Sequence, residues 1–213
     1  MNSPTAEINQ ALLDVRKAYR LLHDYQRMAL DVTNYIGKQL GLPYVGGWPK
    51  FSDASPKKGK GGLDYWSWDW LNLVFYECHF SEVPMGATGL RVSVLLISDT
   101  GYFCSERESV EQTNVSDFLA AEKSQTMVGF IISGKEWPHP AFLENREQMK
   151  TFIESKGNLP GEYGTAGVIG KCYDYDRLVN QQETDVLIQE LVACANGAGI
   201  PLKVAPYKLT GKN

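Results

Sequence analysis

The sequence has few cysteines, and their spacing fits neither a metal site nor a disulfide framework. The four cysteines stand at positions 78, 104, 172 and 194 and form no C-x-x-C pair. This spacing argues against a zinc knuckle and against a small secreted disulfide scaffold. Three of the four lie in apolar runs, where a free thiol usually acts as a small buried hydrophobe. We therefore expect a protein of a reducing compartment that needs no metal and no other cofactor.

Long hydrophobic runs and an excess of positive charge are also lacking. No stretch of about eighteen apolar residues is present to span a bilayer. The first ten residues, MNSPTAEINQ, lack the basic and apolar regions of a signal peptide. The formal net charge of −4 gives no electrostatic reason to bind nucleic acid or an anionic membrane. We expect a cytoplasmic protein without a membrane partner, and the net charge does not favour nucleic-acid binding.

The size and composition are those of one ordinary globular domain. The 213 residues are 43% hydrophobic and 22% charged, and the chain has no internal repeat and no low-complexity segment. A domain of this length buries roughly 70% of the surface of its unfolded chain, so it can build a core without cross-links. The sequence therefore predicts a single domain over residues 1–213.

Residues 1–42 are predicted to form a long amphipathic helix. Ser3-Pro4 is a typical start, because serine caps free amide groups and proline suits the first helical position. Apolar residues then recur in nine steps over the 32 residues from Ile8 to Leu40, about 3.6 residues per step, which is the α-helical period. The stripe consists of Ile8, Leu12, Val15, Tyr19, Leu22, Tyr25, Ala29, Val32, Ile36 and Leu40. The Gly-Leu-Pro sequence at 41–43 supplies a left-handed cap, a hydrophobic contact and a stop.

The length of this helix makes a prediction about partners. At 1.5 Å per residue it would be roughly 55 Å long, which is more than the width of a domain of this size. It therefore either breaks, near residue 24 or within 34–37, or projects from the domain. A projecting apolar stripe needs a cover, most simply the same helix of a second copy. The alternative is two shorter helices that both pack on the domain's own sheet.

The rest of the chain is predicted to hold a long loop, a sheet and two helices. Residues 43–63 are rich in glycine, proline, serine and lysine without any period, which indicates a loop. Strands are expected at 65–80, 89–98, 102–104, 127–133 and 168–175, with an optional edge strand at 200–204. Helices are expected between the His-Pro pair at 139–140 and Gly157, and from Asn180 to Gly197. Asp99-Thr100-Gly101 is expected to be a tight hairpin turn.

This order of elements predicts an α+β fold. Strands that are connected by hairpins give a mostly antiparallel sheet, here of about five strands within residues 64–213. The two later helices are expected to pack on one face of that sheet, and the long first helix precedes it.

Four polar residues are weak candidates for a catalytic cluster. Glu77 and His79 lie two residues apart on one strand face, a spacing at which both side chains can reach one substrate or metal. Asp174 and Asp176 share a face of another strand and would complete a carboxylate cluster of the magnesium-nuclease kind. The alternative is a set of solvent-facing polar residues. The enzyme interpretation requires Asp174 to lie close to Glu77.

The segment 44–70 is unusually rich in aromatic residues and is the candidate ligand or partner surface. Four of the five tryptophans fall here, beside a group of lysines. Aromatic rings with neighbouring cations are typical of surfaces that bind flat ligands, single-stranded nucleic acid or protein anchors. The alternative is that the tryptophans fill the core beneath the long helix. The residues concerned are Trp48, Lys57, Lys58, Trp66, Trp68 and Trp70.

These observations lead to three hypotheses about function. The first is a non-catalytic binding or regulatory module that self-associates through the N-terminal helix and binds a ligand or partner at 44–70. The second is a small metal-assisted hydrolase or nuclease that uses Glu77, His79, Asp174 and Asp176. The third is a structural or assembly subunit. The sequence favours a protein that is not an enzyme.

Overall fold

The structure is a computed structural model that describes residues 4–51, 71, 74–84, 88–134, 141–159, 163 and 167–205. Its helices are α1 (Pro4–Gln39), α2 (Arg146–Glu154) and α4 (Gln181–Gly197). The five strands are β1 (Tyr44–Pro49), β2 (Phe75–Ser81), β3 (Arg91–Ile97), β4 (Met127–Ser133) and β5 (Val168–Asp174). They form one sheet in the order β1-β2-β3-β4-β5, and every neighbouring pair is antiparallel. The predicted α+β class, the long first helix, the five-stranded sheet and the two later helices are confirmed.

Of the two alternatives for α1, a break or a projecting helix, the structure has the second: the helix is continuous through residue 24 and through 34–37. It ends as predicted, because Gly41 takes a φ of 67° and the amides of Gly41 and Leu42 donate to the carbonyls of Lys38 and Gly37. Gly37 does not break the helix; it lets the helix approach the sheet. A Cβ atom at this position would lie 2.3 Å from a ring carbon of Phe80 on β2. Gly37, which lies in the range considered for a break, is therefore a position of close packing between α1 and β2.

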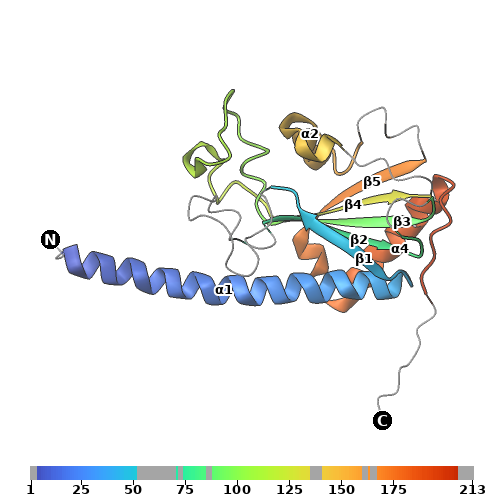
Figure 1. The fold of residues 1–213 in the computed structure, drawn as a ribbon, viewed down its shortest axis with the longest axis horizontal. Coiled ribbons are helices and arrows are strands. Elements are labelled where there is room, and N and C mark those ends of the chain that lie inside the picture. Colours follow the sequence, from blue (N-terminus) through green and yellow to red (C-terminus); the bar gives the residue numbers. More distant parts are fainter. Residues whose placement is uncertain are drawn as a thin grey trace, which may run out of the picture.

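The helices α1 and α4 lie on one side of the sheet and α2 lies on the other (Figure 1). An apolar core fills the space on each side. On one face, α1 and α4 cover side chains of the four strands β2 to β5, with Ile36 and Leu191 among the buried residues. On the other face, α2 and the segment 99–105 cover a second cluster, which includes Phe103 and Phe152. The two later helices thus lie on opposite faces, and not on one face as the pattern suggested. All seven residues of β3 and of β4 are buried, and strands buried on both sides need a cover on each.

Three further segments differ from expectation. The start of the predicted loop 43–63 is the edge strand β1, whose backbone pairs with β2. Residues 102–104 are a turn and not a strand, because the amide of Cys104 donates back to the carbonyl of Thr100. Residues 200–205 form no strand: Ile200 and Leu202 are buried in the core on the α1 face, and the side-chain amide of Asn196 bonds the carbonyl of Leu202. The pairing of β1 and the burial of Ile200 and Leu202 depend on tertiary contacts that a local pattern does not contain.

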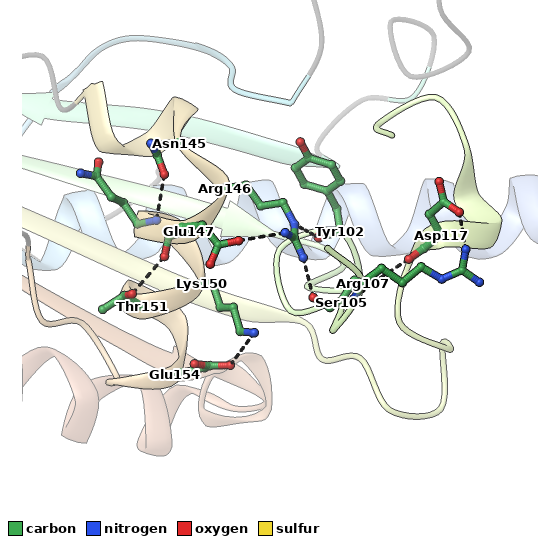
Figure 2. A network of polar contacts seen from close by, with 11 residues as sticks. Tyr102, Ser105, Arg107, Asp117, Asn145, Arg146, Glu147, Lys150, Thr151 and Glu154 are labelled. Atoms are coloured by element: carbon green, nitrogen blue, oxygen red, sulfur yellow. Dashed lines mark hydrogen bonds and ion pairs between the residues drawn. The ribbon is translucent and has the colours of Figure 1, made fainter. Parts of the chain in front are cut away.

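Arg146 at the start of α2 fixes the turn after β3 in place (Figure 2). Its guanidinium donates to the backbone carbonyls of Tyr102 and Ser105 and pairs with the carboxylate of Glu147. One side chain therefore holds the segment 102–105 against the helix that covers the same face of the sheet.

Candidate functional site

The N-terminal half of α1 extends beyond the sheet (Figure 1). Its 36 residues correspond to about 54 Å of helix, and among the described residues the apolar core on α1 begins at Ala29. Five stripe side chains before that point are 38 to 69% exposed. These residues are Ile8, Leu12, Val15, Tyr19 and Leu22, which we call the open seam. The helix therefore carries an apolar surface that no core cluster of the described residues covers.

The open seam and the buried part of α1 belong to one heptad series. The open seam has alternating spacings of four and three residues, which is the spacing of a coiled-coil interface. The same alternation continues through Gln26, Ala29, Thr33, Ile36 and Leu40. The last four of these are buried, with exposed fractions of 6% or less. One face of α1 therefore packs on the sheet at its C-terminal end and is open at its N-terminal end.

A groove begins where the open seam ends. It has a volume of about 590 Å³ and lies between α1 and the first two strands. Gln26, Leu30, Asp31, Thr33 and Asn34 line it from the helix, and Tyr44, Tyr76, Cys78 and Phe80 line it from β1 and β2. At 100° per residue, Gln26, Leu30 and Thr33 point within about 60° of Leu12 and Tyr19. The open seam therefore leads along the helix into the groove.

Glu77 and His79, the first pair of the predicted cluster, do lie together, inside the face that α2 covers. Both side chains are fully buried, and His79 Nε2 lies 3.6 Å from a carboxylate oxygen of Glu77. On the neighbouring strand β3, the Ser93 hydroxyl shares a hydrogen bond of 2.6 Å with His79 Nδ1. Neither carboxylate oxygen of Glu77 has a hydrogen-bond partner among the described residues. These groups form a buried polar cluster on the face of the sheet that α2 covers.

Burial is the main influence on the pKa of Glu77. Desolvation raises the pKa of Glu77 to about 7, although the positive charges of Lys50 and Arg91 act in the opposite direction. The Lys50 side chain is 3% exposed and its Nζ lies 3.4 Å from a carboxylate oxygen of Glu144. Arg91 is also buried and donates to the carbonyl of Pro84. Glu77 is thus poised to change charge near neutral pH.

Asp174 and Asp176 do not join this pair. Asp174 ends β5, so three inter-strand intervals, or about 14 Å, separate its strand from that of Glu77. Its carboxylate is about half exposed and pairs with Lys156 at 3.0 Å. Asp176 is exposed on the short 3-10 helix that follows β5. The convergence that the hydrolase interpretation required is absent for these residues, and the described residues contain no group of three or more potential metal ligands from His, Cys, Asp and Glu.

The aromatic segment is described only at its start. Trp48 is half-buried and its ring centroid lies 4.6 Å from that of His79. It faces the buried polar cluster, on the opposite side of the sheet from α1, so Trp48 does not fill the core beneath the long helix. Lys57, Lys58, Trp66, Trp68 and Trp70 lie outside the described residues.

Comparison with known proteins places the chain in a family. A family model described as PM0109 matches residues 5–199. The chain belongs to the PM0109 family. A protein of Pasteurella multocida (strain Pm70), described as "Uncharacterized protein PM0109", is 56% identical over 38 residues, which are 18% of this chain and 19% of the relative. The aligned segment thus spans about a fifth of the curated relative that it matches. No solved structure matches the chain.

The matched range of the PM0109 family includes the projecting half of α1 together with the sheet. None of the helices in the described ranges combines the length and the apolar character that crossing a bilayer requires.

The sequence patterns missed Ser93, Lys50 and the groove. Arg91 and Ser93 are two residues apart in an apolar run, and Glu77 and His79 show the same spacing on the previous strand. Two such polar pairs on adjacent strands signal a shared polar patch once the register is known. The groove has no comparable signal, because its walls come from α1, from β2 and from Tyr44 on β1, a strand that was predicted as loop.

Proposed function

We propose that this member of the PM0109 family is a non-catalytic binding or assembly module that joins two copies of itself through α1. The observation that carries the proposal is the open seam, five apolar side chains at heptad spacing on a rigid projecting helix. A heptad seam is self-complementary, since the same stripe on a second helix provides matching layers. A contiguous apolar stripe of this kind on a helix favours a protein partner over solvent.

The magnitudes favour a weak dimer from the seam alone. Full burial of an aliphatic side chain contributes about 1.5–3 kcal/mol. The five seam side chains are on average about half buried in the single chain, so association can gain only about half of this amount for each. Ten side chains in a pair then contribute roughly 10 kcal/mol. The loss of translational and rotational freedom on association costs about 4–15 kcal/mol. The dimer therefore needs further contacts beyond the seam to be tight.

The test is the oligomeric state of the full chain, measured by sedimentation velocity over a range of concentrations. We expect a monomer–dimer equilibrium for the wild type and a rise in Kd of about 100-fold for Leu12→Asp. Leu21→Asp is the matched control, because Leu21 is 72% exposed on the same helix but lies off the seam. Both changes are on the exposed half, so the domain remains folded, which circular dichroism verifies.

A wild type that stays monomeric at a few hundred micromolar would contradict the proposal. An equal effect of Leu12→Asp and Leu21→Asp would also contradict it, because general surface charge and not the seam would then control association. The hydrolase hypothesis is not carried forward, since Asp174 does not meet Glu77. Of the segment 44–70, the proposal retains Tyr44, which lines the groove next to the seam.

A further inference from the structure

We infer that the two α1 helices of the dimer run antiparallel, and that the first turns of each helix lie at the groove of the other copy. This inference rests on the proposed self-association and specifies its geometry. The occupant of the groove is thus a named segment of a second copy, the N-terminal part of α1. Three features of the described residues lead to it.

The first feature is that the chain's own sheet occupies the seam from Ala29 onward. Ala29, Thr33, Ile36 and Leu40 are buried on the same helix face as the open seam. In a parallel pair, the partner helix would have to leave this face at residue 29, because the two sheets would meet there. In an antiparallel pair, each sheet lies beyond the N-terminus of the other helix. The antiparallel arrangement therefore overlaps the whole open seam without a collision.

The second feature is the register that the heptad series allows. Antiparallel coiled coils pair the two kinds of seam position with each other. The pairing Leu12 with Leu22, Val15 with Tyr19 and Ile8 with Gln26 gives six layers around a two-fold axis near residue 17. Shifting the pairing register by one heptad toward the N-termini of the helices leaves Leu22 without a seam residue opposite it. Moving one heptad the other way places Leu12 against Ala29, which is fully buried already.

The third feature is where this register brings the N-terminal turns. Ile8 of the second copy comes to Gln26, which lines the groove with Leu30 and Tyr44. Ile8, Leu30 and Tyr44 are each more than half exposed. The groove thus supplies the additional apolar contact that the seam alone lacks. Ala11 and Ala18 flank the seam on one side, and their small side chains permit a short distance between the helix axes.

Cysteine cross-linking of the full chain tests the direction of the helices. Leu12→Cys and Leu22→Cys carry different affinity tags and are mixed under mild oxidation. Each variant alone is one control. The wild type is the second control and shows whether the four native cysteines form cross-links. We expect a disulfide-linked heterodimer from the mixture and little product from either variant alone, because two residues at position 12 would be about 15 Å apart along the axis. Rapid cross-linking of Leu12→Cys with itself would show a parallel pair and overturn the inference, while the proposed self-association would stand.

Occupation of the groove is tested separately by a matched pair of charge substitutions. Leu30→Asp is expected to raise the dimer Kd at least tenfold, because Leu30 lies in the groove and is 52% exposed. Met28→Asp is the control, since Met28 is 44% exposed on the same turn but points away from the seam. A dimer whose Kd is unchanged by Leu30→Asp would overturn the groove contact. A protein that is monomeric without any substitution would instead remove the proposed function itself, so the two failures are distinguishable.

Discussion

Replacing Glu77 with glutamine tests whether the buried carboxylate destabilises the fold at neutral and alkaline pH. The side chain is fully buried, and burial raises its pKa from an ordinary 4.5 to about 7. Glutamine has nearly the same shape and cannot ionise. We therefore expect Glu77→Gln to stabilise the protein above pH 7 and to change its stability little near pH 4.5.

The sign and size follow from proton linkage. Between pH 4.5 and 7 the folded protein holds a proton on Glu77 that the unfolded chain has lost, so the free energy of unfolding falls as pH rises. Above pH 7 both states are ionised and the penalty is constant. A shift from 4.5 to about 7 corresponds to about 3 kcal/mol at 1.36 kcal/mol per pKa unit. The wild type is thus expected to lose this amount between pH 4.5 and 8, and the variant is not.

Urea unfolding of both proteins at four pH values between 4.5 and 8 measures this difference. The protein concentration is kept constant and low, so that self-association does not contribute. Glu106→Gln, at an exposed position, is the control and is expected to leave the pH dependence unchanged. A Glu77→Gln variant that is less stable than the wild type by the same amount at every pH would refute the reasoning, because the carboxylate would then be a favourable partner of Lys50 and Arg91.

Two further predictions concern how the helices are built. Gly37→Ala is expected to destabilise the protein by about 1–3 kcal/mol in thermal unfolding, because the added methyl group would overpack against Phe80. Gly197→Ala is the control and is expected to change stability by less than about 1 kcal/mol, because a Cβ there would meet nothing within 4 Å. Equal effects of the two changes would contradict the close approach of α1 to the sheet. Asn180→Ala is expected to cost about 0.5–2 kcal/mol in the same assay, because the Asn180 side chain accepts the amide hydrogen of Glu183 at the start of α4, and Asn180→Asp should restore most of the loss.

The end of α1 and the start of α4 were predictable because their signals are local, whereas α2 begins at Arg146, later than the His-Pro pair at 139–140 suggested. Asn180 caps the start of α4 by accepting the amide hydrogen of Glu183, within the first turn of that helix. The Gly-Leu-Pro sequence ends α1 through contacts with its last turn. The sequence left open whether α1 breaks within 34–37, because that outcome is not decided by a local signal. Whether a glycine breaks a helix or admits a neighbour depends on Phe80, which is 43 residues away in the chain.

Two features of the sheet show where a sequence pattern is sufficient and where it is not. The apolar runs of β3 and β4 were sufficient to predict two strands, but the prediction of helices on one face was wrong, because both strands are buried on both sides. The edge strand β1 contains two glycines and a proline, which are typical of a loop, and it is held by its pairing with β2. The separation of Asp174 from Glu77 follows from strand order, because the two share a sheet face but lie on strands that are three positions apart.

The burial of the C-terminal half of α1 in the core also keeps its exposed N-terminal half helical. A helix of this length is marginal in water when isolated, because its first turn is costly to form. In this protein the C-terminal half is fixed by Ala29, Ile36 and Leu40 in the core, and by a hydrogen bond from Tyr35 to Asp185 on α4. The exposed half then only extends a helix that is already nucleated. In the proposed dimer a second copy would therefore meet a largely formed surface, and the ordering cost that weakens the binding of flexible segments would be small.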